Sequence, residues 1–161
     1  ETLKAAIQRG LDDGGTMLLD GRDVKVDEYP NGYFLGPTIL EGLKPGDWLY
    51  DEEAFGPVVC LDKVEELDQA IKIINDNPKG NAVTIYTESG ENARHFREKI
   101  NCGQIGINIG VVAPIAWFPF LGNKESFFGQ NHAQGKEVVQ FFTQQRVVIE
   151  RFHGSTKIEW E

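Results

Sequence analysis

The sequence predicts an α/β domain in which a mainly parallel sheet carries helices on its faces. Short apolar runs alternate with segments whose apolar residues recur every three or four positions, which is the period of an amphipathic helix. From Pro57 to Ile109 the resulting order is strand, helix, strand, helix, strand. Such alternation favours parallel strands joined by helical crossovers. A length of 161 residues with 40% hydrophobic and 25% charged residues is sufficient to bury a core.

The first forty residues are predicted to form a helix followed by two strands. Thr2 is a candidate N-cap, apolar residues follow at helical spacing up to Leu11, and Gly14–Gly15 provides a stop. The elements expected next are a strand at 17–19, a turn at Asp20–Gly21, an exposed polar excursion at 22–31, a strand at 33–40 and a loop at Pro45–Gly46.

The middle of the chain contains the clearest alternation. Residues 57–61 are nearly all apolar, as expected of a strand that is covered on both faces. The helix that follows should end at Asn77–Pro78, because proline cannot continue it. The remaining elements are strands at 82–86 and 104–109, separated by a helix whose inner face carries Ala93, Phe96 and Ile100.

The periodicity fails between Gly110 and Gly129, where phenylalanine, tryptophan and proline cluster. We interpret this stretch as a long aromatic loop, and loops of that length in compact domains are usually functional. A short helix at 137–142 and a final strand at 146–152 are expected after it. That strand carries apolar residues on both faces, so it either edges its own sheet or pairs with another subunit.

Composition excludes several classes of function. A formal net charge of −9 with scattered lysines and arginines argues against a nucleic-acid partner. No apolar run approaches the roughly 18 residues that span a bilayer, so we expect no membrane segment and an intracellular protein. Cys60 and Cys102 indicate neither a disulfide framework nor a zinc site, and the three histidines lie far apart, so no metal site is expected.

The most informative segment is Asp51–Val58, which places two carboxylates, an aromatic ring and a Gly-Pro turn directly before an apolar strand. If its backbone is extended, Glu53 and Phe55 point to the same side. A carboxylate can accept from two adjacent ribose hydroxyls, while a ring offers a flat apolar face to a heteroaromatic base. The pair would suit a nucleoside, although acidic residues before a strand are more often simply solvated.

Several motifs in order resemble the aldehyde dehydrogenases. The chain has Gly-Tyr-Phe-x-x-Pro-Thr at 32–38, Glu-Glu-x-Phe-Gly-Pro at 52–57, an asparagine-rich helix end at 75–81 and Pro-Phe-Leu-Gly at 119–122. The likeness covers about residues 1–152. Softer markers at 80–81, 103–108, 118–127 and 140–144 resemble the CoA-acylating methylmalonate and malonate semialdehyde dehydrogenases, whereas Lys79 and Leu121 depart from the usual pattern.

The resemblance implies roles for four side chains. Glu53 would hold the hydroxyls of the nicotinamide ribose of NAD, and Phe55 would lie against the nicotinamide ring. Phe118 and Phe120 would line the aldehyde pocket, the alternative for both being plain core packing. Residues 1–136 would then be the C-terminal part of the catalytic domain, and residues 137–161 an oligomerisation strand and tail that joins a homo-oligomer. The location would be cytoplasmic, or the mitochondrial matrix in a eukaryote.

The residues that perform the chemistry in this family are expected upstream of this segment. The resemblance implies a cysteine thiolate that attacks the semialdehyde, hydride transfer to NAD, and transfer of the acyl group to CoA with loss of CO₂. Neither Cys60 nor Cys102 is predicted to be that nucleophile, so no catalytic residue is assigned and the chain alone should be inactive. The alternatives are a piece of a non-acylating aldehyde dehydrogenase, or a binding or oligomerisation module of the same fold without catalysis.

Overall fold

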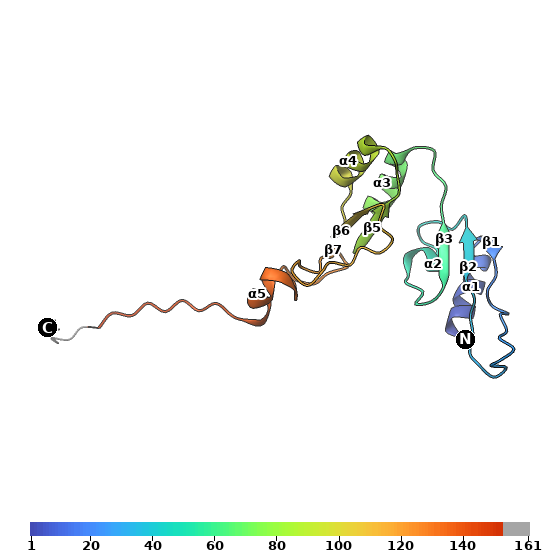
Figure 1. The fold of residues 1–161 in the computed structure, drawn as a ribbon, viewed down its shortest axis with the longest axis horizontal. Coiled ribbons are helices and arrows are strands. Elements are labelled where there is room, and N and C mark those ends of the chain that lie inside the picture. Colours follow the sequence, from blue (N-terminus) through green and yellow to red (C-terminus); the bar gives the residue numbers. More distant parts are fainter. Residues whose placement is uncertain (153–161) are drawn as a thin grey trace. The chain divides into compact units, whose positions relative to one another are not determined.

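The computed structural model describes residues 1–152, and the chain divides into two compact units, Glu1–Asn77 and Pro78–Glu161 (Figure 1). Both units contain helices and strands, so the predicted α/β class is confirmed. The contact-based division falls at Asn77, whereas the expected functional boundary after residue 136 stays a prediction.

The first unit is built on helix α1, Thr2–Asp12. Its buried residues Ala6, Ile7 and Gly10 lie on one face, and the hydrophobic core also contains Leu40, Leu43 and Leu49. Thr2 is not the cap that the sequence predicted: Glu1 occupies the N-cap position and makes no side-chain bond there. The predicted stop is confirmed, since Gly14 has a φ of 105° and the amide of Gly15 donates to the carbonyl of Gly10.

A three-stranded sheet completes this core. Its strands are β1 (Thr16–Leu19), β2 (Thr38–Glu41) and β3 (Val58–Leu61) in that order, with β1 antiparallel and β3 parallel to β2. The second strand was predicted to begin at Tyr33 but begins at Thr38. The reason is that the amide of Gly36 donates to the carbonyl of Gly21, which closes the 22–35 excursion before the ladder starts.

Helix α2, Trp48–Asp51, connects β2 to β3 and was not expected from the sequence. The carboxylates of Asp47 and Asp51 accept from the amides of Lys44 and Gly46, which shapes the preceding turn and directs Leu49 into the core. The prediction that β3 is covered on both faces was wrong. It is the edge strand of its sheet, and Val59 is 52% exposed.

Helix α3, Leu67–Asp76, ends before Asn77–Pro78 as predicted. It begins with a capping box, in which Glu66 and Gln69 satisfy each other's backbone amides. Ile71 is its buried residue.

The second unit is organised around the parallel pair β5 (Ala82–Ile85) and β6 (Gln104–Ile107), joined by helix α4 (Gly90–Lys99). Ser89 caps α4 by accepting from the amide of Asn92, and Phe96 and Ile100 are buried. A short antiparallel pair, β4 (Lys79–Gly80) with β7 (Asn123–Lys124), joins the start of this unit to the end of the aromatic loop.

The last described elements are a 3₁₀ turn, Gly135–Glu137, and helix α5, Val138–Phe142, which confirm the short helix expected there. Buried His132 stacks on Phe127 with ring centroids 4.2 Å apart, and its Nδ1 lies 2.6 Å from a carboxylate oxygen of Glu137. These hydrogen bonds lower the pKa of Glu137 below its ordinary value. The contacts of His132 with Phe127 and Glu137 therefore fix the start of α5.

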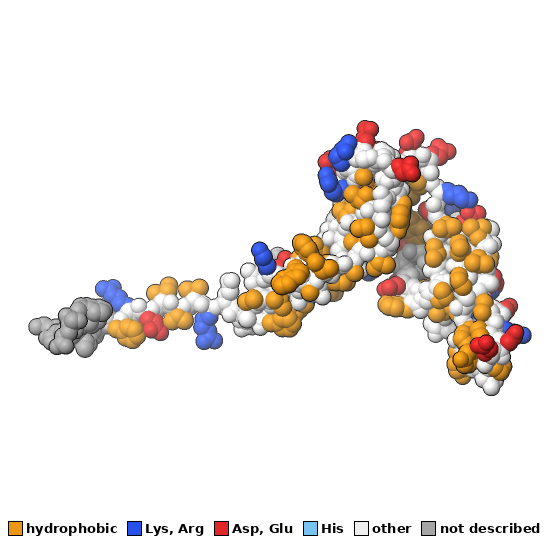
Figure 2. Space-filling view, viewed as in Figure 1, with side chains coloured by type: hydrophobic (Ala, Val, Ile, Leu, Met, Phe, Trp, Pro, Cys, Tyr) orange, Lys and Arg blue, Asp and Glu red, His pale blue; other side chains and the backbone are white. Residues whose placement is uncertain are grey.

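Residues 143–152 form neither helix nor strand, so the strand predicted at 146–152 is not observed within the described part of the chain. A strand needs a hydrogen-bonded neighbour, and this segment has none among residues 1–152. Its side chains are exposed, with Ile149 at 93%, and Figure 2 shows hydrophobic groups on its surface. Within the described residues no helix is long and apolar enough to cross a bilayer.

Candidate cofactor and substrate site

The segment that carries Glu53 and Phe55 links α2 to β3. The amide of Glu52 donates to the carbonyl of Trp48 and closes α2. The amides of Gly56 and Val58 then donate to the carbonyls two residues before them, at 2.7 and 2.8 Å, which makes two successive tight turns. The Gly-Pro sequence thus turns the chain sharply into β3.

Between the end of α2 and Gly56, the side chain of Ala54 faces inward and packs against the hydrophobic core. Glu53 is exposed and Phe55 is 83% exposed. The core therefore anchors the segment through its central residue and presents the carboxylate and the ring on the surface. Both side chains are accessible to a ligand, as the nucleoside interpretation requires, and neither is used for packing.

The aromatic loop begins at Asn108, a residue that the sequence analysis did not single out. Asn108 has a φ of 57°, and its side-chain amide both accepts from the amide of Thr87 at 2.8 Å and donates to the carbonyl of Thr87 at 3.0 Å. Asparagine tolerates this left-handed conformation better than most residues do. The amide thus redirects the chain out of β6 while staying bonded to the end of β5.

Phe118 and Phe120 lie near the end of this loop, exposed by 60% and 48%. Neither ring is buried in the core of the second unit, which was the alternative to a role in the aldehyde pocket. Phe118 lines a hollow of about 300 Å³ whose other walls are Gln104, residues 109 and 111–114, Pro119 and Leu121. Phe120 does not line it. All these walls except Gln104 are apolar, which suits an aliphatic group and offers no positive charge to a carboxylate.

Gln104 is the second residue that the sequence analysis missed. It is buried in β6, and its Nε2 donates to the carbonyl of Leu121 at 2.9 Å. The sequence signal was an amide two residues before Gly106 in an otherwise apolar strand, a combination that indicates close coverage of one strand face.

The two cysteines are poor nucleophiles in this structure. Cys60 lies in β3, where its thiol faces the carbonyl of Leu49 at 3.7 Å, and Cys102 is buried. Burial raises the pKa of both thiols, and Lys124 offsets this only partly at Cys102. Because the thiolate is the reactive form, a raised pKa disfavours it at both positions. That neither cysteine is the nucleophile stays a prediction.

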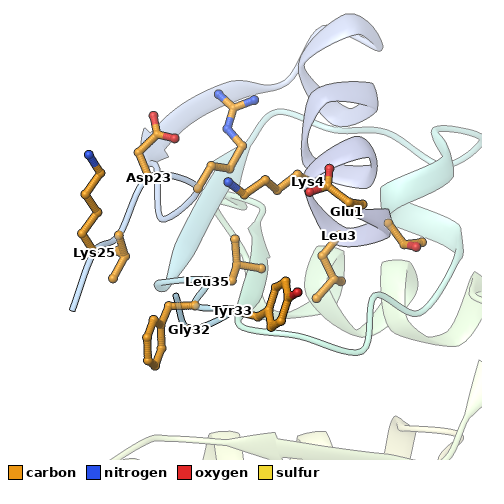
Figure 3. Close-up of a pocket in the computed structure, with 12 residues that line it drawn as sticks. Glu1, Leu3, Lys4, Asp23, Lys25, Gly32, Tyr33 and Leu35 are labelled. Atoms are coloured by element: carbon orange, nitrogen blue, oxygen red, sulfur yellow. The ribbon is translucent and has the colours of Figure 1, made fainter. Parts of the chain in front are cut away.

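Another hollow, of about 520 Å³, lies between the first turn of α1 and residues 22–35 of the excursion (Figure 3). Its lining is electrostatically mixed, since Lys4, Arg22 and Lys25 are accompanied by Glu1 and Asp23. None of the four predicted site residues lines it.

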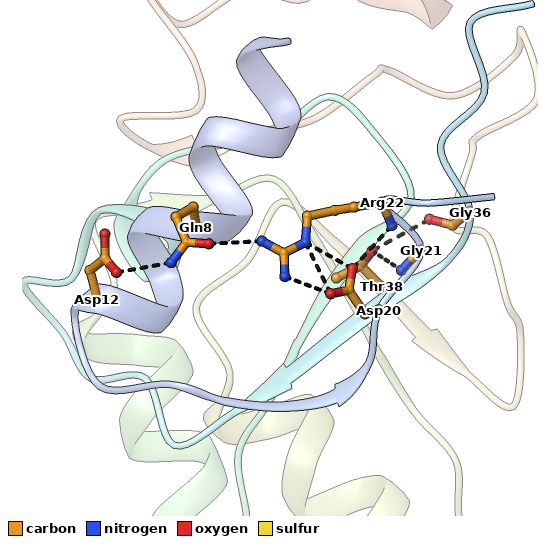
Figure 4. Close-up of polar contacts among 7 residues, drawn as sticks. All are labelled: Gln8, Asp12, Asp20, Gly21, Arg22, Gly36 and Thr38. Carbon is orange, nitrogen blue, oxygen red and sulfur yellow. Dashed lines mark hydrogen bonds and ion pairs between the residues drawn. The ribbon is translucent and has the colours of Figure 1, made fainter.

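Beside it, a polar network fixes the excursion to α1 and β2 (Figure 4). The carboxylate of Asp20 accepts from the guanidinium of Arg22 at 2.6 to 3.0 Å, and Arg22 also donates to Gln8. The amide of Gly21 donates to the hydroxyl of buried Thr38 at 3.1 Å. The side-chain hydrogen bond from Arg22 is the main cause that lowers the pKa of Asp20 to about 2.

The structure therefore places the candidate residues as two exposed pairs. Glu53 and Phe55 lie on the surface of the first unit, and Phe118 and Phe120 lie on the loop of the second. The geometry of each pair is defined within its own unit.

The comparisons with known proteins assign the chain. The model of the Aldehyde dehydrogenase family matches residues 1–148. The chain belongs to this family. A Dictyostelium discoideum protein assigned as a mitochondrial, acylating methylmalonate-semialdehyde/malonate-semialdehyde dehydrogenase is 47% identical over 143 residues, 88% of this chain and 27% of that protein. The malonate-semialdehyde dehydrogenase of Bacillus cereus is 42% identical over 152 residues, 94% of this chain and 31% of that enzyme.

Solved structures agree with the sequence comparison. A Sinorhizobium meliloti protein assigned as a methylmalonate-semialdehyde dehydrogenase, in complex with NAD, matches with a TM-score of 0.84 at 31% identity. The match covers 95% of this chain and 31% of that one. The chain thus spans about a third or less of the length of its relatives.

Proposed function

We propose that this chain is the C-terminal part of an NAD-dependent, CoA-acylating malonate or methylmalonate semialdehyde dehydrogenase. The observation that carries the proposal is its identity of 42% to 47%, over nearly its whole length, to a malonate-semialdehyde dehydrogenase and to a relative assigned as an acylating methylmalonate-semialdehyde/malonate-semialdehyde dehydrogenase. The parent enzyme would convert a semialdehyde, CoA and NAD to acetyl-CoA or propionyl-CoA, CO₂ and NADH.

In this proposal Glu53 and Phe55 provide one side of the NAD site. Ala54 anchors the segment to the hydrophobic core, and the exposed carboxylate of Glu53 can accept from both hydroxyls of the nicotinamide ribose. The exposed ring of Phe55 offers a face to the nicotinamide. Residues and ligand therefore fit chemically. NAD would supply the hydride acceptor, and this chain would orient it.

Phe118 and Phe120 provide apolar walls for the aldehyde in the same proposal. The hollow beside Phe118 would accommodate the aliphatic part of the substrate. A semialdehyde also has a carboxylate, and because no cation lines this hollow, its binding group would come from elsewhere in the parent enzyme.

The nucleophile would also come from elsewhere in the parent. The raised pKa of Cys60 and of Cys102 supports this, since it disfavours the reactive thiolate at both positions. Residues 146–152, whose apolar side chains are exposed, would join the sheet of another subunit and make a homo-oligomer.

A chimera tests the proposal. This chain would replace the matching segment of the malonate-semialdehyde dehydrogenase of Bacillus cereus. The folded chimera should form NADH from malonate semialdehyde, because this chain would supply the missing part of the NAD and aldehyde sites, whereas the 161-residue chain alone should form none. A folded chimera that forms no NADH would contradict the proposed function, and activity of the chain alone would contradict the predicted absence of the nucleophile.

A variant of the chimera assigns the cofactor role. E53Q should raise the KM for NAD about tenfold, because a neutral amide accepts ribose hydroxyls more weakly than a carboxylate does. E52Q, which removes the neighbouring exposed charge, is the matched control and should leave that KM unchanged. Equal effects of the two variants would show that only the local charge matters.

A further inference from the structure

The buried face of strand β6 is covered by the aromatic loop. Gln104 and Gly106 are the buried positions of β6, two residues apart and therefore on the same face. A Cβ placed on Gly106 would lie 2.5 Å from a methyl carbon of Val112, and one on Gly103 would lie 2.7 Å from the backbone of Gly122. The start of the loop, at Val112, thus packs directly on β6, and a later part, at Gly122, packs on the residue before β6.

The Gln104 amide is bonded on one side only. Its Nε2 donates to the carbonyl of Leu121 at 2.9 Å, whereas its Oε1 is buried and accepts no hydrogen bond. A buried acceptor without a partner costs free energy, and an apolar side chain of similar length would avoid that cost. The bond to Leu121 is therefore the specific contribution of this side chain, and filling space alone would not require an amide.

Leu121 follows Phe120 directly, and Gln104, Phe118 and Leu121 line the same hollow. A second contact holds the loop farther back, where the amide of Gly135 donates to the carbonyl of Ala116 at 3.2 Å. Between these two tethers lie Trp117, Phe118 and Phe120, all largely exposed, so little side-chain burial fixes their positions.

We infer that Gln104 is a positioning residue for the aldehyde pocket: its amide holds the carbonyl of Leu121 and thereby fixes the loop segment that carries Phe118 and Phe120. The assignment of these rings to the pocket rests on the proposed function. The tether itself belongs to this chain, so it is testable apart from catalysis.

The test is backbone hydrogen exchange of the full chain, measured residue by residue by NMR, for Q104M. Methionine keeps the length and volume but removes both the donor and the orphaned acceptor. The protection factors of the Phe118 and Gly135 amides, both bonded to loop carbonyls, should fall about two- to tenfold, the range for one neutral hydrogen bond. Protection of the Asn108 amide, which donates to Ile85, and the urea midpoint should not fall.

Two controls separate positioning from general destabilisation. Q130M makes the same chemical change at an exposed site and should leave all these amides unchanged. Q104E keeps the shape but places an acceptor against the Leu121 carbonyl. It should loosen the loop at neutral pH and restore protection when acid protonates the carboxyl, which can then donate.

Unchanged protection of Phe118 and Gly135 in both Gln104 variants would overturn the inference. A uniform loss across β5 and β6 would overturn it too, because it would indicate a merely structural role. Neither outcome would bear on the chimera, whose NADH formation tests the proposed function separately.

Discussion

At the scale of single residues, the side chains proposed to bind ligands are exposed, whereas those that hold the backbone in place are buried. Glu53 and Phe55 are exposed, whereas Gln104 and Thr38 are buried and make specific hydrogen bonds to backbone groups. The exposed pair could be predicted because its chemistry is visible in a short motif. The buried pair could not, because its partners, Leu121 and Gly21, lie 17 residues away in sequence.

The ion pair of Asp20 with Arg22 gives a prediction about pH. The pKa of Asp20 is lowered from 3.8 to about 2 in the folded chain, chiefly by the hydrogen bond from Arg22. A lowered folded-state pKa means that the carboxylate stabilises the fold above about pH 4 and loses this contribution as the pH falls towards 2. Urea unfolding should show D20N less stable than the wild type at pH 7, with the difference vanishing near pH 2.

The control for this prediction is D27N, which removes an exposed carboxylate from the same excursion. It should leave the pH dependence of unfolding nearly unchanged. A D20N difference that persists undiminished at pH 2 would mean that the charge of Asp20 is not what holds the excursion.

At the scale of elements, local signals predicted the helices better than the strands. The spacing of apolar residues and the end signals at Gly14 and Pro78 located α1, α3 and α4 closely. The start of β2 and the coverage of β3 were wrong, because each depends on which segments pair across the sheet. Helix α2 was missed because four residues are too few to show a period.

The closure of the 22–35 excursion gives a prediction at this scale. The backbones of Gly21 and Gly36 approach so closely that a Cβ on Gly21 would overlap the carbonyl oxygen of Gly36. G21A should therefore destabilise the first unit by about 2–3 kcal/mol, the cost of overpacking a tight site. Urea unfolding, followed by a spectroscopic probe in the first unit, measures this loss of stability. Equal stabilities of G21A and the wild type would contradict the close contact.

At the scale of the whole molecule, the sequence predicted a strand in the exposed segment 143–152, but it could not predict what that strand pairs with. The predicted strand at 146–152 carries apolar residues on both faces, but a strand forms only against a partner, and none lies among residues 1–152. Family membership could be predicted from ordered motifs, whereas assembly could not be derived from the fold of one chain.

The proposed oligomer is tested in the chimera. V147K with I149K places two charges on one side of the segment and should raise the dissociation constant of the assembly at least about tenfold, because lysines on a strand edge oppose pairing. Size-exclusion chromatography with light scattering measures the shift towards monomer. Q144K with Q145K adds the same charge directly before the predicted strand at 146–152 and should leave the assembly intact. Identical oligomers for both variants would contradict the proposed interface.

The separate hydrophobic core of the first unit affects how the stability of this chain must be measured. Its buried cluster, from Ala6 to Leu49, lies wholly within residues 1–77. Because these buried contacts are shared inside one unit, a substitution in the cluster should change the melting of that unit. A spectroscopic probe placed within residues 1–77 therefore reports the effect of such a substitution most directly.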